Sequence, residues 1–278
     1  MSNKVIAVVV DGLRFDTACE TFGFIEHLVE TNQAARYKVK SELPSLSRPL
    51  YEVLLTGTPA FENGITTNQT VRLSKEKSLF HLVKEHGLKS AAAAYYWVSE
   101  LYNSAPFDFA QDRLQMDESK PIQYGLFYWE DDYPDSHLMA DAENLRRRFS
   151  PDFLYIHPMG VDYKGELYGA GSKEYREQSL KMASLLAQLV PIWMQEGYHI
   201  LITSDHGMSE TGNHGGTTSG ERDVPLYIIS PVVLPGIYEE EIPQLAFAPF
   251  VCELLGIQAS EKMLSKSLPG FKKKEMLT

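Results

Sequence analysis

Short apolar runs alternate along the chain with longer stretches in which apolar side chains recur at helical spacing. Residues 5–10 form a continuous, mostly β-branched run, which is typical of a strand buried on both faces in a parallel sheet. Further runs of this kind, and the periodic stretches between them, predict alternating strands and helices. We predict strands at 5–10, 90–97, 153–157, 199–203 and 224–230, and helices at 16–31, 50–55, 78–86, 137–148, 172–195 and 247–255.

This alternation predicts an α/β fold with a mostly parallel central sheet and helices on both faces. We find no internal repeat, low-complexity tract or clear linker in the chain, so we predict a single domain over residues 1–278. Residues 98–133 are rich in Tyr, Phe, Pro and Asp and show no clear periodicity. We interpret them as an irregular, aromatic-rich segment of that domain.

The charge balance narrows the range of partners. The 278 residues include 26 Lys+Arg and 37 Asp+Glu, and the formal net charge is −11. Nucleic-acid polymers and anionic membranes are bound by basic surfaces, so we expect neither as the main partner. The first apolar run is too short for a signal peptide or a membrane span, and we therefore expect a cytoplasmic protein. The acidic balance leaves open how an anionic substrate would be attracted.

Carboxylates and imidazoles follow several of the predicted strands. In an α/β sheet, ligands bind beyond the carboxyl ends of the strands, so side chains at these positions are brought to one edge. Taken singly, each is equally explained as a turn residue, a helix cap or a surface side chain. Taken together, they are the donors that a divalent metal ion requires. The candidates are Asp11, Asp162, the pair Asp205-His206, and His214 in a Gly-rich loop.

A candidate nucleophile, Ser47, precedes the predicted helix at 50–55. The helix dipole stabilises an alkoxide at such a position and also favours an incoming phosphate. A serine hydroxyl still needs a base or a metal ion to lower its pKa. The chain has no G-x-S-x-G turn, which favours activation by metal. The alternative is that Ser47 only caps the helix.

Five segments, in the same order, resemble motifs of the alkaline phosphatase superfamily, most closely those of its nucleotide pyrophosphatase/phosphodiesterase branch. The resemblance runs from residue 5 to about residue 216 and implies an alkaline phosphatase-like α/β fold. The segments are VDGLR at 10–14, PSLSRP at 44–49, a T-G-T-P…G-I…N stretch ending at Asn68, SDHGM at 204–208 and NHG at 213–215.

The same resemblance implies roles for individual residues. Ser47 corresponds to the nucleophile, and Asn68 to a hydrogen-bond donor toward a phosphoryl oxygen. The implied cofactors are two divalent metal ions, zinc or alternatively manganese. The implied ligands of one ion are Asp11, Asp205 and His206 together with Ser47, and those of the other are Asp162, His214 and Glu166.

Three features depart from the family pattern. Glu166 stands four residues after Asp162, where the family has His, and a carboxylate is a harder ligand that shifts preference toward manganese. Arg48 follows the nucleophile where diesterases often carry an aromatic residue. We expect Arg48 to pair either with an additional phosphate charge or with a structural Asp. The chain is also short for this branch, so large substrate-binding insertions are missing.

The resemblance implies a metal-dependent hydrolase of phosphodiester or nucleotide pyrophosphate bonds that acts through a phospho-serine intermediate at a two-metal site. One alternative, supported by Arg48, is a phosphomonoesterase or phosphonate hydrolase of the same superfamily. Another, slightly supported by Glu166, is a catalytically inactive binding protein on this scaffold. The expected partner is a small phosphorylated substrate rather than a nucleic-acid polymer or a membrane. The sequence leaves the oligomeric state open.

Overall fold

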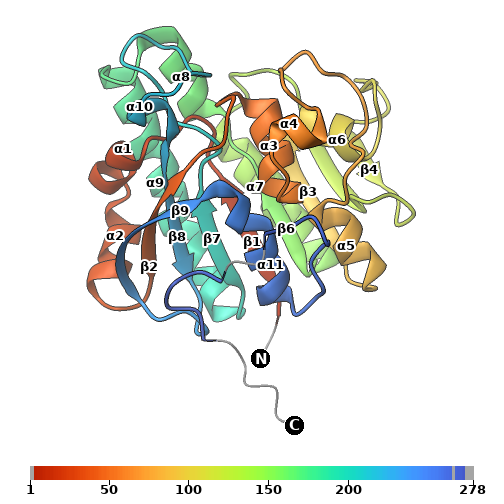
Figure 1. Cartoon of the computed structure of the whole chain (residues 1–278). Coiled ribbons are helices and arrows are strands. Elements are labelled where there is room, and N and C mark those ends of the chain that lie inside the picture. The colour runs from red at the N-terminus through yellow and green to blue at the C-terminus, as the bar shows by residue number, and fades with distance from the viewer. Residues whose placement is uncertain (1–2, 265–266, 273–278) are drawn as a thin grey trace.

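The computed structural model describes residues 3–264 and 267–272, and its described strands form one nine-stranded sheet (Figure 1). The strand order is β4-β5-β3-β6-β1-β7-β8-β2-β9. β4 pairs antiparallel with β5, and β8 pairs antiparallel with both β7 and β2, whereas the other neighbouring strands are parallel. The predicted mostly parallel α/β sheet is therefore confirmed. The strands are β1 (Val5–Val9), β2 (Ala35–Lys40), β3 (Ser90–Tyr95), β4 (Leu114–Met116), β5 (Tyr124–Tyr128), β6 (Phe153–Ile156), β7 (His199–Thr203), β8 (Asp223–Ile229) and β9 (Gly236–Pro243).

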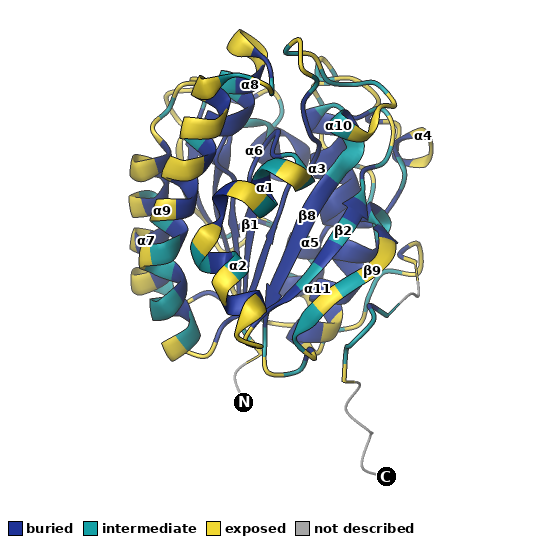
Figure 2. Cartoon of the chain, turned by 90° about the vertical axis from the view of Figure 1, so that its left-hand side faces the viewer, coloured by how far each residue is buried: buried dark blue, intermediate teal, exposed yellow. Residues whose placement is uncertain are grey.

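Helices cover both faces of the sheet, as predicted (Figure 2). Apolar side chains of α1, α2, α7 and α9 pack in the core of one face, and those of α3, α5, α6 and α11 pack in the core of the other. The helices are α1 (Phe15–Thr21), α2 (Gly23–Glu30), α3 (Ser47–Thr56), α4 (Ala60–Asn63), α5 (Leu79–Glu85), α6 (Trp97–Tyr102), α7 (Asp135–Phe149), α8 (Gly160–Tyr168), α9 (Lys173–Gln195), α10 (Ser219–Arg222) and α11 (Phe247–Leu255).

The central strand β1 contributes side chains to the cores on both faces of the sheet. Every residue of β1 is buried, with Val5, Ala7 and Val9 in one core and Ile6 and Val8 in the other. Successive side chains of a strand point to opposite faces, so a continuous apolar run supplies both cores at once.

The parallel arrangement of β1, β6 and β7 brings the segments that follow them to one edge of the sheet. β1 lies between β6 and β7 and is parallel to both. In register, Val8 lies opposite Ile156 and Val9 lies opposite Thr203, so the three strands end almost level. This edge, at the top of Figure 1, is where the predicted metal ligands meet.

Several elements differ from the predicted ones. The helix predicted at 16–31 is two helices, α1 and α2, which are separated at Phe22. The segment 98–133 is not wholly irregular, because it contains β4 and β5, and β5 pairs in parallel with β3. The strands β2 and β9 and the helix α8 were not predicted.

Within residues 3–264 and 267–272, no helix combines the length and the apolar character needed to cross a membrane.

Candidate metal and phosphoryl-transfer site

Four predicted residues converge at the ends of β1 and β7 and at the start of α3. The Nε2 atom of His206 lies 3.3 Å from Asp11 Oδ1, 3.4 Å from Asp205 Oδ2 and 3.0 Å from Ser47 Oγ. Donor atoms around a tetrahedral ion with bonds of about 2 Å are separated by about 3.3 Å. The four side chains, all buried, therefore have the spacing of one metal position.

The remaining predicted ligands form an adjoining group. Asp162 and Glu166 lie one turn apart on α8. His214 Nε2 is 3.2 Å from Glu166 Oε1 and 3.9 Å from Asp162 Oδ1. The rings of His206 and His214 stack with their centroids 4.0 Å apart, so the two groups share a boundary. The structure thus brings all the predicted metal ligands together.

The two imidazoles are held in the orientation that metal ligation requires. His206 Nδ1 is 2.8 Å from the carbonyl oxygen of Gly207, and His214 Nδ1 is 3.1 Å from that of Ser45. A carbonyl oxygen can only accept, so each Nδ1 carries the proton and donates it. In a neutral ring, Nε2 then presents its lone pair to the surrounding carboxylates, where a cation would satisfy both.

The turn after β1 permits the close approach of α8. Gly12 has a φ of +69°, and a Cβ built there would lie 2.8 Å from the Cα of Asp162. The Gly12 amide donates to Asp205 Oδ1 at 3.3 Å, and its carbonyl accepts from the hydroxyl of Tyr175 at 2.6 Å. Any larger residue would push Asp11 and Asp162 apart, which is why glycine is required at this position.

Unpaired oxygen atoms and shifted pKa values support a bound cation. Among the described residues, Asp11 Oδ1, Asp162 Oδ1 and Asp205 Oδ2 are buried without a hydrogen-bond partner. Burial and the neighbouring carboxylates raise the pKa of Asp162 and of Asp205 well above the usual range. Burial and the charge of His214 lower the pKa of His206 to about 3. Divalent ions would offset the free-energy cost of burying these carboxylates without partners. The donor set therefore fits the two ions that the family resemblance implied.

Ser47 and Asn68 lie close together at the start of α3. Ser47 is the first residue of α3 and is 3% exposed. Asn68 Oδ1 accepts a hydrogen bond of 3.1 Å from the amide of Arg48, which follows Ser47 directly. The amide oxygen of Asn68 is thereby engaged, and its Nδ2 group is the atom left to donate to a substrate oxygen.

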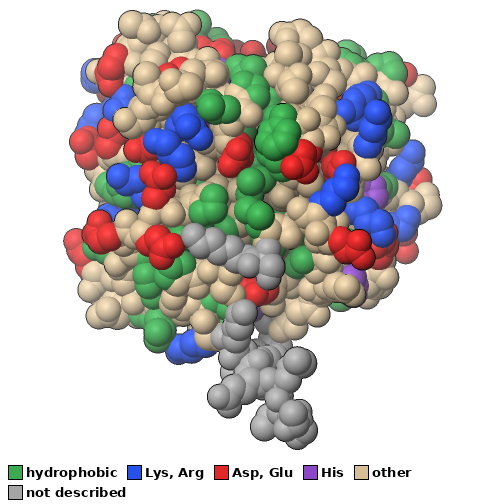
Figure 3. Space-filling model, viewed as in Figure 1, with side chains coloured by type: hydrophobic (Ala, Val, Ile, Leu, Met, Phe, Trp, Pro, Cys, Tyr) green, Lys and Arg blue, Asp and Glu red, His purple; other side chains and the backbone are tan. Residues whose placement is uncertain are grey.

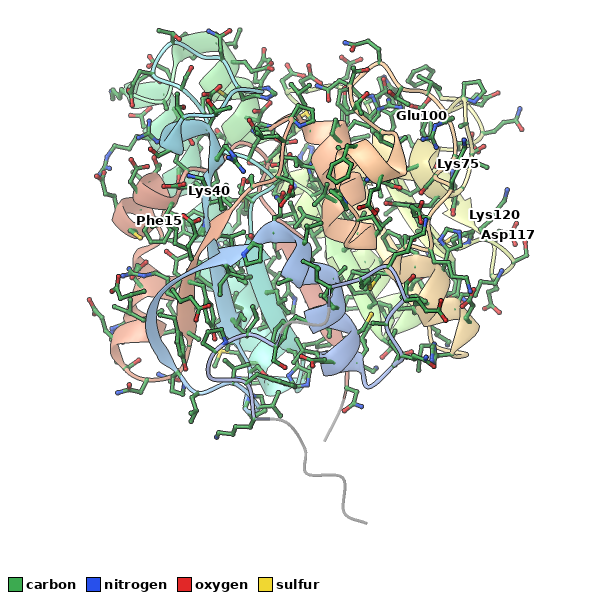
Figure 4. All side chains as sticks on the ribbon, viewed as in Figure 1. Phe15, Lys40, Lys75, Glu100, Asp117 and Lys120 are labelled. Atoms are coloured by element: carbon green, nitrogen blue, oxygen red, sulfur yellow. The ribbon has the colours of Figure 1, made fainter. Side chains whose placement is uncertain are left out.

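Arg48 has a structural partner. Its Nη2 donates to Glu100 Oε2 at 2.7 Å, its Nη1 donates to the carbonyl of Thr70 at 2.7 Å, and its guanidinium lies 4.6 Å from the ring centroid of Trp97. Glu100 projects from α6, as labelled in Figure 4. Of the two roles expected for Arg48, the structural one holds, although the partner is a Glu rather than an Asp. Because Arg48 is 1% exposed, no face of it is open to a phosphate.

We expect Arg48→Met to destabilise the protein by about 3–5 kcal/mol, because it leaves the Glu100 carboxylate buried and unpaired. Arg176→Met is the matched control, since Arg176 and Glu20 form an exposed pair whose loss should cost under about 1 kcal/mol. Chemical denaturation of both variants measures the difference. Adding Glu100→Gln to Arg48→Met should recover part of the loss, and equal stability of Arg48→Met and the parent protein would contradict this assignment.

Two further side chains at Asp11 were not predicted as site residues. Tyr51, one turn after Ser47 on α3, donates to Asp11 Oδ2 at 2.5 Å. His157 Nε2 lies 3.1 Å from the same oxygen. Ligand atoms of Asp11, His157 and Asp205 all lie within 4.8 Å of one another, as do those of Asp162, His206 and His214. The position of His157 directly after β6 is the sequence signal that would have marked it.

The sequence profile of the type I phosphodiesterase / nucleotide pyrophosphatase family matches residues 5–221. The chain belongs to this family. The match contains β1, β6 and β7 and every side chain of the two ligand groups described above. Together with the fold, it confirms membership of the alkaline phosphatase superfamily.

One curated relative of this chain is GPI ethanolamine phosphate transferase 2 from Candida albicans. It is 26% identical over 242 residues, which cover 82% of this chain and 26% of the relative. The chain spans between 23% and 38% of the length of the curated relatives that it matches first.

Solved structures share the fold at low sequence identity. Murine ectonucleotide pyrophosphatase / phosphodiesterase 5 has a TM-score of 0.75 at 13% identity, with 92% of this chain and 96% of that chain covered. The alkaline phosphatase PafA has a TM-score of 0.71 at 11% identity, with 98% and 99% covered. These similarities confirm the alkaline phosphatase-like fold.

The site lies at the edge where the molecular surface is notched. Figure 3 shows a shallow notch at the top of the molecule, between the part that carries α8 and the part that carries α4 and α6. Asp162 and Glu166 belong to the first part, and Ser47 and Asn68 flank the second.

Proposed function

We propose that this protein is a metal-dependent phosphodiesterase in which Ser47 is the nucleophile. The observation that carries the proposal is the convergence of Ser47 Oγ with Asp11, Asp205 and His206 on one position, with donor separations of 3.0–3.4 Å. A serine that only capped α3 would need no such surroundings. The N-cap residue of α3 is Leu46 rather than Ser47, and Ser47 Oγ lies 3.0 Å from His206 Nε2.

The residues divide the chemistry as follows. Divalent ions, when bound, would lower the pKa of the Ser47 hydroxyl and neutralise charge on the phosphoryl oxygens. Ser47 Oγ gives its proton to solvent and attacks phosphorus in line, so that the Oγ–P bond forms while the bond from phosphorus to the leaving oxygen breaks and that oxygen departs with the bonding electron pair. Asn68 donates a hydrogen bond to an equatorial oxygen. Water then cleaves the phospho-serine ester from the side that the leaving group vacated.

A phosphodiester or nucleotide pyrophosphate is the substrate class we propose. The main support for a phosphomonoester was Arg48, which would have matched the additional negative charge. Arg48 is buried against Glu100 instead, so this support is removed. The family match points in the same direction.

Turnover of a bis-aryl phosphate compared with that of a mono-aryl phosphate tests the substrate class. Purified protein would be assayed with added Zn²⁺ and with added Mn²⁺. We expect the diester to be favoured in kcat/KM by at least about tenfold, equivalent to about 1.4 kcal/mol in the transition state. Preference for the monoester would favour the phosphomonoesterase or phosphonate hydrolase alternative.

A transferase is the second candidate, and the names of the curated relatives favour it. A transferase and a hydrolase share the first step, attack of Ser47 on a phosphodiester, and differ in whether an alcohol or water accepts the group. Adding a primary alcohol during diester turnover distinguishes them. With a bis-aryl phosphate as substrate, the phospho-serine keeps one aryl group. A mixed alkyl aryl phosphodiester, formed in a larger proportion than the mole fraction of the alcohol in the solvent, identifies a transferase, and the aryl phosphomonoester as the only product identifies a hydrolase.

Glu166 is proposed as the third protein ligand beside Asp162 and His214. We expect Glu166→Ala to lose part of the bound metal, because Oε1 is the carboxylate oxygen nearest to His214 Nε2, at 3.2 Å. Elemental analysis of the variant measures the loss. Glu177→Ala, which removes an exposed carboxylate from α9, is the control. Unchanged metal content in Glu166→Ala would remove Glu166 from the ligand set.

The proposal includes three further points. Zinc is the preferred metal, the cytoplasm is the compartment, and a small phosphorylated compound is the partner. The nitrogen donors of His206 and His214 support zinc over an all-oxygen metal such as magnesium. Competition between Zn²⁺ and Mn²⁺ for the metal-free protein would decide the first point.

A further inference from the structure

The side chain of His157 is buried completely and has no hydrogen bond. It directly follows β6 and is 0% exposed. Among the described residues, it is the histidine for which both ring nitrogens are buried without a hydrogen-bond partner. A buried polar group without a partner is destabilising unless something absent from the protein atoms satisfies it. His157 therefore needs an explanation that its protein neighbours do not provide.

The orientation of the His157 ring is set by its surroundings. The ring lies parallel to that of Tyr155, with an interplanar angle of 4° and 6.2 Å between centroids. The ring of Tyr51 meets it edge-on at 4.5 Å. The backbone is held as well, since the amide donates to Ala93 and the carbonyl accepts from the hydroxyl of Tyr128. These contacts hold Nε2 toward Asp11.

His157 faces the carboxylates of Asp11 and Asp205, and the Asp11 oxygen nearest to it also accepts from the hydroxyl of Tyr51. Its Nε2 lies 3.1 Å from Asp11 Oδ2, a separation similar to those between the donors around His206. Ligand atoms of Asp11, His157 and Asp205 lie within 4.8 Å of one another. Asp11 Oδ1 and Asp205 Oδ2 also lack hydrogen-bond partners. The three side chains thus present unsatisfied donor atoms to a common space.

The geometry points to His157 as a further metal ligand, acting with Asp11 and Asp205, so that the centre holds three imidazoles. This inference rests on the metal centre of the proposed function. It also bears on the departure at Glu166, where the chain has one imidazole fewer than the family pattern. His157 supplies an imidazole from the end of β6, in the group of Asp11 and Asp205 rather than in that of Glu166. An added nitrogen donor favours a divalent transition metal, zinc above all, over magnesium or calcium.

Imidazole ¹⁵N NMR of the zinc-loaded full chain tests the assignment at the atom concerned. A metal ligand has no proton on Nε2 and shows the shift of a coordinated nitrogen, whereas a hydrogen-bond donor to Asp11 carries a proton there. The His157 signal is assigned by its loss in His157→Gln. We expect His157 Nε2 without a proton and with a zinc-dependent shift. A protonated Nε2 that does not change on zinc binding would overturn the inference.

A metal titration provides a second readout. Metal-free His157→Gln should bind one of its Zn²⁺ equivalents at least about tenfold more weakly, since even outer partners of a metal ligand change affinity by about 10–100-fold. His137→Gln, which replaces an exposed histidine on α7, should leave binding unchanged. Equal zinc affinity in both variants would also overturn the inference. If His157→Gln does not fold, the signal is assigned through its bonds to the His157 backbone, and the NMR measurement on the parent protein still decides.

Neither experiment uses a substrate, so each can succeed or fail independently of the diester turnover that tests the proposed function. Zinc coordination by His157 in a protein that does not turn over diesters would leave this inference standing and remove the phosphodiesterase. Diester turnover without zinc coordination by His157 would support the phosphodiesterase and overturn the assignment of His157 as a ligand.

Discussion

Ser47→Ala should abolish nearly all turnover of a bis-aryl phosphate while both metal ions remain bound. The substitution removes the atom that forms the covalent bond, and removal of a nucleophile typically costs a factor of roughly 10⁴ to 10⁶. The carboxylates and imidazoles of the site are untouched, so elemental analysis should return the metal content of the parent protein. Steady-state kinetics and metal analysis of the same preparation are the measurements.

Ser45→Ala is the matched control for this result. Ser45 lies in the same segment, and its hydroxyl donates to the carbonyl of Gly216 rather than facing the metal ligands. Its loss should leave most of the turnover. Retention of more than about a tenth of the activity in Ser47→Ala would contradict nucleophilic catalysis, given the losses typical of such substitutions.

Removal of the metal ions should abolish diester turnover and weaken the binding of inorganic phosphate by at least about tenfold. Without ions, the buried carboxylates of Asp11, Asp162 and Asp205 leave the site with no positive charge to attract an anion. Two divalent ions would change the formal net charge only from −11 to about −7, yet they would make this site locally positive. Bound ions would therefore explain how an acidic protein attracts an anionic substrate.

Calorimetric titration of the chelator-treated protein with phosphate, before and after zinc is restored, measures the effect. Asp205→Asn is the companion variant, because it removes the negative charge of one proposed ligand. This variant should bind the ion shared by Asp11, Asp205 and His206 poorly even when zinc is restored. Tight phosphate binding by the metal-free protein would show that another positive group recognises the anion.

Strands with continuous apolar runs could be predicted from the sequence, and others could not. β1 is apolar throughout and β7 is apolar at Ile200–Ile202, and both are buried along their whole length because helices cover both faces. In β2, by contrast, Arg36, Lys38 and Lys40 alternate with buried side chains, which hides the strand among charged residues. The short helix α8 was also missed, because two glycines and weak periodicity obscure it.

The candidate site was predicted in outline because its ligands follow strands that end at one edge. Asp11, Asp205 and His206 follow β1 and β7 directly, so their convergence follows from parallel pairing. The partner of Arg48 could not be predicted, since Glu100 lies 52 residues away on α6 and the contact exists only in the folded protein. His157 required the structure for a different reason, because only burial and the unpaired ring nitrogens distinguish it from an ordinary core histidine.

Elemental analysis of the purified full chain tests the central claim, a catalytic two-metal centre at this edge, most directly. A two-metal phosphoryl-transfer site predicts about two equivalents of divalent metal per chain, with zinc the main element, after dialysis against metal-free buffer. No retained metal, both as purified and after incubation with Zn²⁺ or Mn²⁺, would contradict the claim and favour a binding protein built on a catalytically inactive scaffold.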